Sequence, residues 1–167
     1  MKVQVRRGVF ETNSSSVHSI CITTEDKFEY FPAEVVFAPG EFGWESIEYR
    51  DLASKASYLW TAIINYVDEM YWHDVETCKK MIVATLEKYN IKAIFIGGIP
   101  GERYSATGYI DHGNELDEFI KDVVNDEDRL MQYLFSDRSY VATGNDNDDT
   151  IPYIDATYPH EVYNKYN

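Results

Sequence analysis

Apolar residues recur at helical spacing in two segments of the first hundred residues. The first runs from Asp51 to Val67, and Asp51 is a suitable N-cap because its carboxylate can accept a backbone N–H of the first turn. The second follows Asp74, which can cap it with Thr77 in the first turn. Both segments are predicted to be amphipathic helices with one face in the core. The apolar positions are Leu52, Ala56, Leu59, Ile63 and Val67 in the first helix, and Val75, Cys78, Ile82, Leu86 and Tyr89 in the second.

Residues 115–136 have a third helical pattern with an acidic face. The pattern is interrupted near Asn125, where Asp126 can cap a second helical piece. Phe119 and Ile120 fall on the predicted buried side, so the acidic residues around them are expected to face solvent.

Shorter segments rich in β-branched and aromatic residues predict strands. In residues 17–22 the alternation places His18, Ile20 and Ile22 on one face of a regular strand, whereas Ser19 and Cys21 lie on the other. Residues 91–97 form an apolar run typical of a buried strand. The other predicted strands are residues 2–10, Glu34 to Phe37, residues 107–112 and residues 139–143.

The last part of the chain has no clear periodicity. Residues 144–149 form a very polar turn, and residues 150–167 are predicted to be an irregular tail. We find no repeat or linker, and 167 residues fit one domain. The sequence therefore predicts a single α+β domain over residues 1–167, with a short mixed or antiparallel sheet packed against about four helices.

The formal net charge of -14 is unevenly distributed. Residues 1–100 hold 14 acidic and 10 basic residues, whereas residues 101–167 hold 15 acidic and 5 basic residues. Such a field repels nucleic acid and favours basic partners, including the positively charged grooves of nucleic-acid enzymes. The alternative is that the charge only keeps the protein soluble. Phe42 and Trp44, in an aromatic loop, can contact a partner or fold back on the core.

Cys21 and Cys78 are the two cysteines of the chain. Without a cleavable leader or an apolar run of about 20 residues, the sequence predicts a cytoplasmic protein with reduced thiols, although one disulfide stays an alternative. Cys78 lies on the apolar stripe of its helix, where a cysteine usually acts as a small hydrophobic residue.

The candidate chemistry centres on the polar run of residues 11–19. His18 ends this run and His112 ends another polar turn, so the two are the best candidates for convergent chemistry. A histidine pair with one or two cysteine or carboxylate groups suits tetrahedral zinc, and Cys21 or Asp111 could supply them. Asp111 could instead orient an imidazole. The alternative interpretation is an ordered, hydrogen-bonded loop without metal.

Two further sites are weaker. The serines 14–16 could supply a nucleophile and His18 a base, but the spacing of these residues does not force a catalytic triad. Residues 144–149 resemble a calcium loop in composition, yet they lack the ligand spacing and closing glutamate of an EF-hand. Whether His73 or Cys78 joins a metal site stays open at this point.

Four segments in order carry a resemblance. These segments, spread over residues 5–148, are VRRGVFETNSSSVHSI, GEFGWE with the following KASYL, GYIDHG and SYVATGNDND. They resemble a family of small proteins carried by phages and prophages of Firmicutes. Some small acidic phage proteins of this kind are anti-CRISPR inhibitors of type II effector nucleases, and the chain is similar to a metal-containing member of that class. The resemblance implies a structural zinc and a protein partner, with His18, His112 and, less directly, Cys21 as ligands.

The sequence therefore favours a non-catalytic binding protein that inhibits a CRISPR type II effector nuclease in the host bacterial cell. An acidic domain can occupy the positively charged channels of such a nuclease without any catalytic group. Two alternatives remain: a small zinc hydrolase that uses His18 and His112, and an acidic DNA mimic that regulates another basic host protein.

Overall fold

Two helices begin at the aspartates that the sequence predicts as caps. Helix α1 spans Leu52–Tyr66, and the carboxylate of Asp51 accepts the backbone N–H of Ser54 at 2.9 Å. Helix α2 spans Val75–Glu87 and is capped in the same way, by Asp74. Each cap satisfies an N–H group that has no partner inside the helix. The core-facing stripe of α2 is also confirmed, and Cys78 on it is fully buried.

The acidic segment forms two short helices. Helix α3 spans Asp117–Asn125 and helix α4 spans Glu127–Phe135. The break between them is at the predicted residue, because the carboxylate of Asp126 accepts the N–H of Arg129 at 3.0 Å and starts α4. Phe119 is buried, as its side of the helix predicts.

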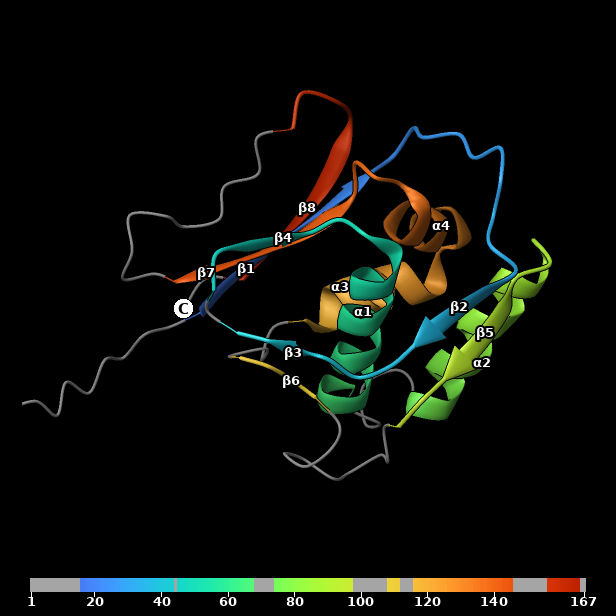
Figure 1. Cartoon of the computed structure of the whole chain (residues 1–167), viewed down its shortest axis with the longest axis horizontal. Helices are drawn as coiled ribbons and strands as arrows, with labels where there is room; N and C mark the ends of the chain where they lie inside the picture. Colours follow the sequence, from blue (N-terminus) through green and yellow to red (C-terminus); the bar gives the residue numbers. More distant parts are fainter. Residues whose placement is uncertain are drawn as a thin grey trace, which may run out of the picture.

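The computed structural model describes residues 16–43, 45–67, 74–97, 108–111, 116–145 and 156–165. The described elements form one compact α+β body of four helices, a four-stranded sheet and two small two-stranded sheets (Figure 1), which confirms the predicted fold class. Some predictions lie outside the described residues, among them the strand at residues 2–10, the position of Trp44, and most of the polar turn at residues 144–149.

Strand β1 lies inside the four-stranded sheet and carries His18. The order is β4-β7-β1-β8, and every neighbouring pair is antiparallel. The register with both neighbours is continuous, so His18, Ile20 and Ile22 face the helices and Cys21 faces the other side, as predicted. The strands are β1 Ser16–Thr23, β4 Ile47–Tyr49, β7 Tyr140–Asn145 and β8 His160–Lys165.

Strand β8 corrects the prediction of an irregular tail over residues 150–167. It pairs with β1 from Ile22↔Glu161 to His18↔Lys165. Its sequence mixes polar and apolar residues without a strong alternation, so only the open edge of β1 selects a strand there.

Two parallel ribbons extend the fold on one side. Strand β2 (Glu34–Phe37) pairs with β5 (Lys92–Phe95), and β3 (Glu41–Phe42) pairs with β6 (Tyr109–Ile110). The bounds of β2 match the prediction. Strand β5 does not match the buried strand predicted over residues 91–97, because it has one partner among the described strands and Lys92 is exposed. The helix α2 covers only one face of it (Figure 1).

Gly108 allows the two segments that lead into β3 and β6 to approach closely. Its φ of +68° lies in the left-handed region, and a Cβ atom there would sit 2.2 Å from the carbonyl oxygen of Gly40. The N–H of Tyr109 donates to the same carbonyl at 2.9 Å, which starts the pairing.

A continuous aromatic core joins the sheet to the helices. Tyr58 on α1 contacts Phe42 edge-on, with ring centroids 4.9 Å apart, and Phe119 on α3 contacts Tyr133 at 5.2 Å. Phe42 therefore folds back on the core, one of the two outcomes expected for the aromatic loop. None of the helices that the structure describes is long and apolar enough to cross a membrane.

Candidate functional site

His18 is buried between the sheet and α1. The side chain is 1% exposed, and its Nδ1 shares a hydrogen bond of 3.2 Å with the hydroxyl of Tyr58. Complete burial raises the pKa of Tyr58 far above its usual value, so the phenol stays protonated at all physiological pH values. His18 is thus part of the packed interior in the region that the structure describes.

The segments that precede His18 and His112 in the sequence meet at the start of β1. The hydroxyl of Ser16, two residues before His18, donates to the backbone carbonyl of Asp111 at 2.7 Å. Strand β6 holds Asp111 there, because the Asp111 N–H donates to Phe42 at 2.8 Å and the Tyr66 hydroxyl donates to the carbonyl of Ile110 at 2.6 Å. His112, the next residue, lies outside the described residues, as does His73.

Cys21 lies on the opposite face of the sheet from His18. The strand has no bulge, so the odd spacing of three residues turns the two side chains apart. The Cys21 Sγ is 3.9 Å from the hydroxyl of Tyr158, beside Tyr140 and Ala142. Burial raises the pKa of the Cys21 thiol. The structure therefore does not bring Cys21 to the side of His18.

The described residues do not fit a zinc site. Among them no group of three or more histidine, cysteine, aspartate or glutamate side chains could hold a metal ion. Of the three predicted ligands, His18 faces the core, Cys21 faces the other side of the sheet, and His112 is not described. Both cysteines, Cys21 and Cys78, are free and buried, and burial raises the pKa of Cys78 to about 12.

A buried lysine on α1 was not predicted from the sequence. Lys55 is 1% exposed, and its ammonium donates to the carbonyl of Ser136, the C-cap of α4, and to that of Ser139 at 3.1 Å. Burial lowers the pKa of Lys55 to about 8. A low lysine pKa can mark a nucleophile. Here the amine is buried and donates to backbone carbonyls, so Lys55 provides a hydrogen-bond donor for the C-terminal end of α4.

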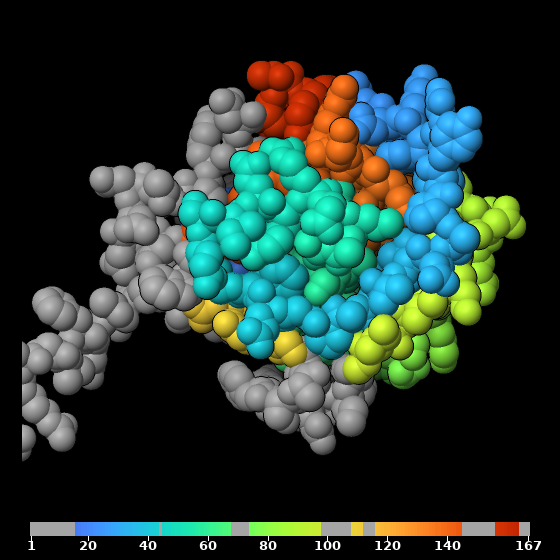
Figure 2. Space-filling view, viewed as in Figure 1, coloured from blue at the N-terminus to red at the C-terminus, as the bar shows by residue number. Residues whose placement is uncertain are grey.

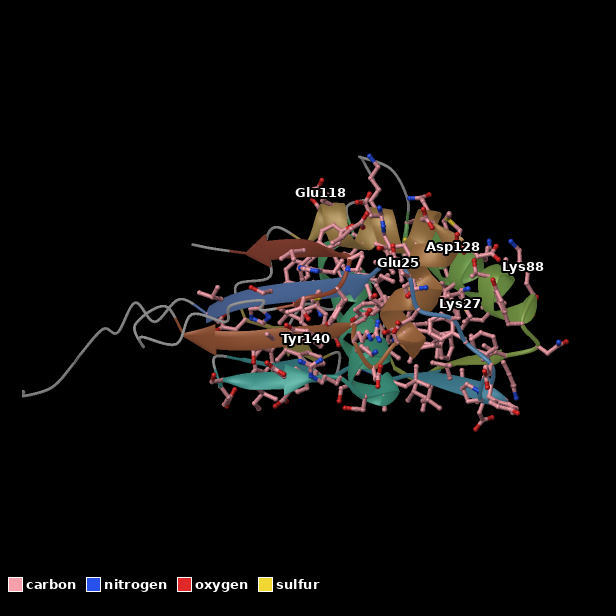
Figure 3. All side chains as sticks on the ribbon, turned by 90° about the horizontal axis from the view of Figure 1, so that it is seen from above. Glu25, Lys27, Lys88, Glu118, Asp128 and Tyr140 are labelled. Atoms are coloured by element: carbon pink, nitrogen blue, oxygen red, sulfur yellow. The ribbon has the colours of Figure 1, made fainter. Side chains whose placement is uncertain are left out.

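The exposed acidic side chains of α3, of α4 and of Asp126 between them form a group of candidate binding residues. We call them the acidic surface. Glu118 on α3 and Asp128 on α4 are exposed and make no ion pair with another described residue. Figure 3 labels both on the two helices, which lie along one side of the molecule. The acidic surface consists of Asp117, Glu118, Asp126 and Asp128.

Two other acidic residues of this region, Asp122 and Glu127, are bonded to side chains of other elements. Asp122 accepts a hydrogen bond from Tyr163 at 2.9 Å and pairs with Arg129 at 3.1 Å. Arg129 also pairs with Glu161 on β8 at 2.7 Å. Glu127 binds both Lys88 and the hydroxyl of Tyr89 (2.9 Å). The sequence predicts only that the acidic residues around Phe119 and Ile120 face solvent, and it does not show these bonds of Asp122, because Tyr163 comes from a distant part of the chain.

Comparison with known proteins gives no further assignment: no protein-family model matches the chain, and no curated protein or solved structure shows a significant match.

Proposed function

We propose that this protein is a non-catalytic inhibitor that binds a basic surface of a partner protein through α3 and α4. The acidic surface is the observation that carries the proposal. Its carboxylates stand on two helices whose apolar faces are buried, and Asp126 caps the second of them, α4. The charges therefore have fixed positions before binding. Preorganised charges of one sign speed association with an oppositely charged partner.

The proposed partner is a type II RNA-guided DNA nuclease, the class that the resemblance implies. Such enzymes hold guide RNA and target DNA in positively charged channels. An acidic protein that occupies such a channel excludes nucleic acid without any chemical step. It needs only a higher affinity for the state whose channel is free.

The burial of His18 supports this class over the zinc hydrolase. A catalytic zinc keeps one position open to water or substrate, and its general base must reach that position. His18 is 1% exposed and hydrogen-bonded to Tyr58, and Cys21 points to the other face of the sheet. Neither side chain reaches solvent as a hydrolytic site requires.

The experiment measures association kinetics with a purified type II nuclease, with and without guide RNA, at several salt concentrations. We expect the on-rate of the wild-type protein to fall at least about tenfold between roughly 50 and 500 mM salt, because screening shortens the reach of the charges. The double variant Glu118→Lys and Asp128→Lys should associate about three- to tenfold more slowly at low salt, with a flatter salt dependence.

The matched control changes the same number of charges elsewhere. Glu41 and Glu45 are exposed near β3 and β4, which lie on the other side of the molecule from α3 (Figures 1 and 3). Their replacement by lysine should change the on-rate much less. Equal effects of the two double variants would show that only net charge matters. No binding at micromolar concentrations would reject the nuclease as partner.

A further inference from the structure

The outward face of the β2–β5 ribbon is apolar at its centre and charged at one end. The inward residues Val35 and Phe37 are buried in the core, so the alternate positions point away from it. Val36 is 38% exposed and Ile96, just after β5, is 53% exposed. In Figure 2 the two segments lie side by side on the visible surface. We call this the β2–β5 face, and it consists of Glu34, Val36, Lys92, Ile94 and Ile96.

Glu34 and Lys92 are direct neighbours across the two strands, and Val36 is opposite Ile94 in the next row of the same face. Both charged side chains are exposed. Among the ion pairs of the described residues, none joins Glu34 to Lys92 or uses either side chain. Within the part of the chain that the structure describes, Glu34 and Lys92 therefore lie side by side on the surface, and neither makes an ion pair.

This arrangement is complementary to itself. A two-fold axis that runs parallel to the strands, between two facing copies, exchanges β2 and β5 but keeps each row in place. Glu34 of one copy then faces Lys92 of the other, and Val36 faces Ile94. Symmetric dimers require such a self-complementary patch. Sheets that pack face to face keep their strand directions within about 30°, which fits this geometry.

Local charge also permits the contact. Two copies with a net charge of -14 each repel one another in general. Residues 79–92, which include much of α2 and the start of β5, contain four lysines and a single glutamate. Residues 25–34, which lead into β2, contain four acidic residues and one lysine, so the two segments together hold five acids and five lysines. The chain on either side of the β2–β5 face is therefore neutral in sum and lacks the excess of acid that would keep two copies apart.

We propose that the β2–β5 face binds a second copy of this chain, in a two-fold dimer held by apolar contact and two Glu34–Lys92 pairs. Stable dimers bury about 800 Å² per partner, and five side chains of this size provide less. The association is therefore weak, with a dissociation constant on the order of 100 μM. It is independent of the acidic surface on α3 and α4.

Sedimentation velocity from about 10 μM to 1 mM protein tests the dimer through a charge exchange. Glu34→Lys alone and Lys92→Glu alone should each weaken dimerisation about tenfold or more, since each places like charges opposite one another. The combined variant exchanges both charges and should restore dimerisation. Glu118→Lys and Lys121→Glu are the controls, because they change net charge equally at exposed positions of α3. They should leave the dissociation constant within about threefold of wild type.

Chemical cross-linking gives a second, geometric measurement. Equal amounts of the Glu34→Cys and Lys92→Cys variants are mixed and treated with a short bismaleimide, because facing sheets are about 10 Å apart, which is too far for a direct disulfide. Any bridge between positions 34 and 92 then joins two chains. The native cysteines, Cys21 and Cys78, are buried and do not compete. We expect the mixed dimer to exceed either homodimer. A monomer at all concentrations, a failure of the charge exchange to restore association, or a predominance of 34–34 bridges would each overturn the proposal.

Discussion

The hydroxyl of Ser16 donates a 2.7 Å hydrogen bond to the backbone carbonyl of Asp111, which lies 95 residues later in the chain. This bond joins the start of β1, the strand that carries His18, to the residue that follows β6. It shows that two polar segments far apart in the sequence lie side by side in the fold.

His18 and Tyr58 are expected to stabilise the fold as a pair. His18→Ala should lower the free energy of unfolding by about 2 to 4 kcal/mol, because it leaves a cavity and an unpaired phenol in the core. Tyr58→Phe removes only the hydroxyl and should cost about 1 kcal/mol. Urea unfolding of both single variants and the double variant, with a chelator present, measures the coupling. Strictly additive effects would contradict a direct interaction.

Cys21 is expected to make no contribution to metal binding. We compare the zinc content of the tag-free wild type with that of Cys21→Ser and His18→Ala by elemental analysis. If zinc binds beside His18, the content should fall in His18→Ala and stay unchanged in Cys21→Ser, because the Cys21 thiol faces the other side of the sheet. Loss of zinc in Cys21→Ser would contradict this geometry. Less than about a tenth of an equivalent in the wild type would reject the structural zinc itself.

Lys55 is expected to make stability rise with pH above about 8. Its pKa is lowered to about 8 in the fold and returns to the ordinary value of 10.5 on unfolding. Between these values the unfolded chain binds more protons, so the free energy of unfolding increases with pH, by at most about 1.4 kcal/mol per unit. The measurement is urea unfolding of the wild type and of Lys55→Met at pH 7, 8, 9 and 10.

The difference between these two proteins isolates Lys55, because the buried tyrosines titrate in both. The wild type should gain stability relative to Lys55→Met from pH 8 to pH 10. Lys80→Met, at an exposed position of α2, should show no such change relative to wild type. A constant difference across this pH range would show that the Lys55 pKa is not lowered.

Asp122 and Glu118 lie on the same helix, but only Asp122 is expected to support the fold. Asp122→Lys breaks the bonds to Arg129 and Tyr163 and places two positive charges together, which should cost about 1 to 2 kcal/mol. Glu118→Lys changes an exposed charge that makes no ion pair with another described residue, and its stability should stay within about 0.5 kcal/mol of wild type. Thermal and urea unfolding of both variants compare them. Equal losses would mean that the Arg129 network adds nothing to stability.

The sequence predicts the parts of this fold that depend on near neighbours. Asp51, Asp74 and Asp126 were identified as caps because a cap bonds an N–H only a few residues away. The alternation in β1 likewise separates His18 from Cys21, since the period of two residues follows from strand geometry alone. A bulge in β1 would be needed to bring the two side chains to one face, and the continuous register shows none in this strand.

Tertiary structure decides the features that depend on distant partners. The tail forms β8 because β1 offers it an edge, and Asp122 is bonded because β8 brings Tyr163 to it. Lys55 is buried because the end of α4 supplies carbonyl acceptors 81 residues away. By itself the sequence determined the α+β class, the helix starts and the faces of β1, since these follow from local geometry. The pairing of strands and the environment of each charge required the folded chain, because contacts between distant segments leave no periodic pattern in the sequence.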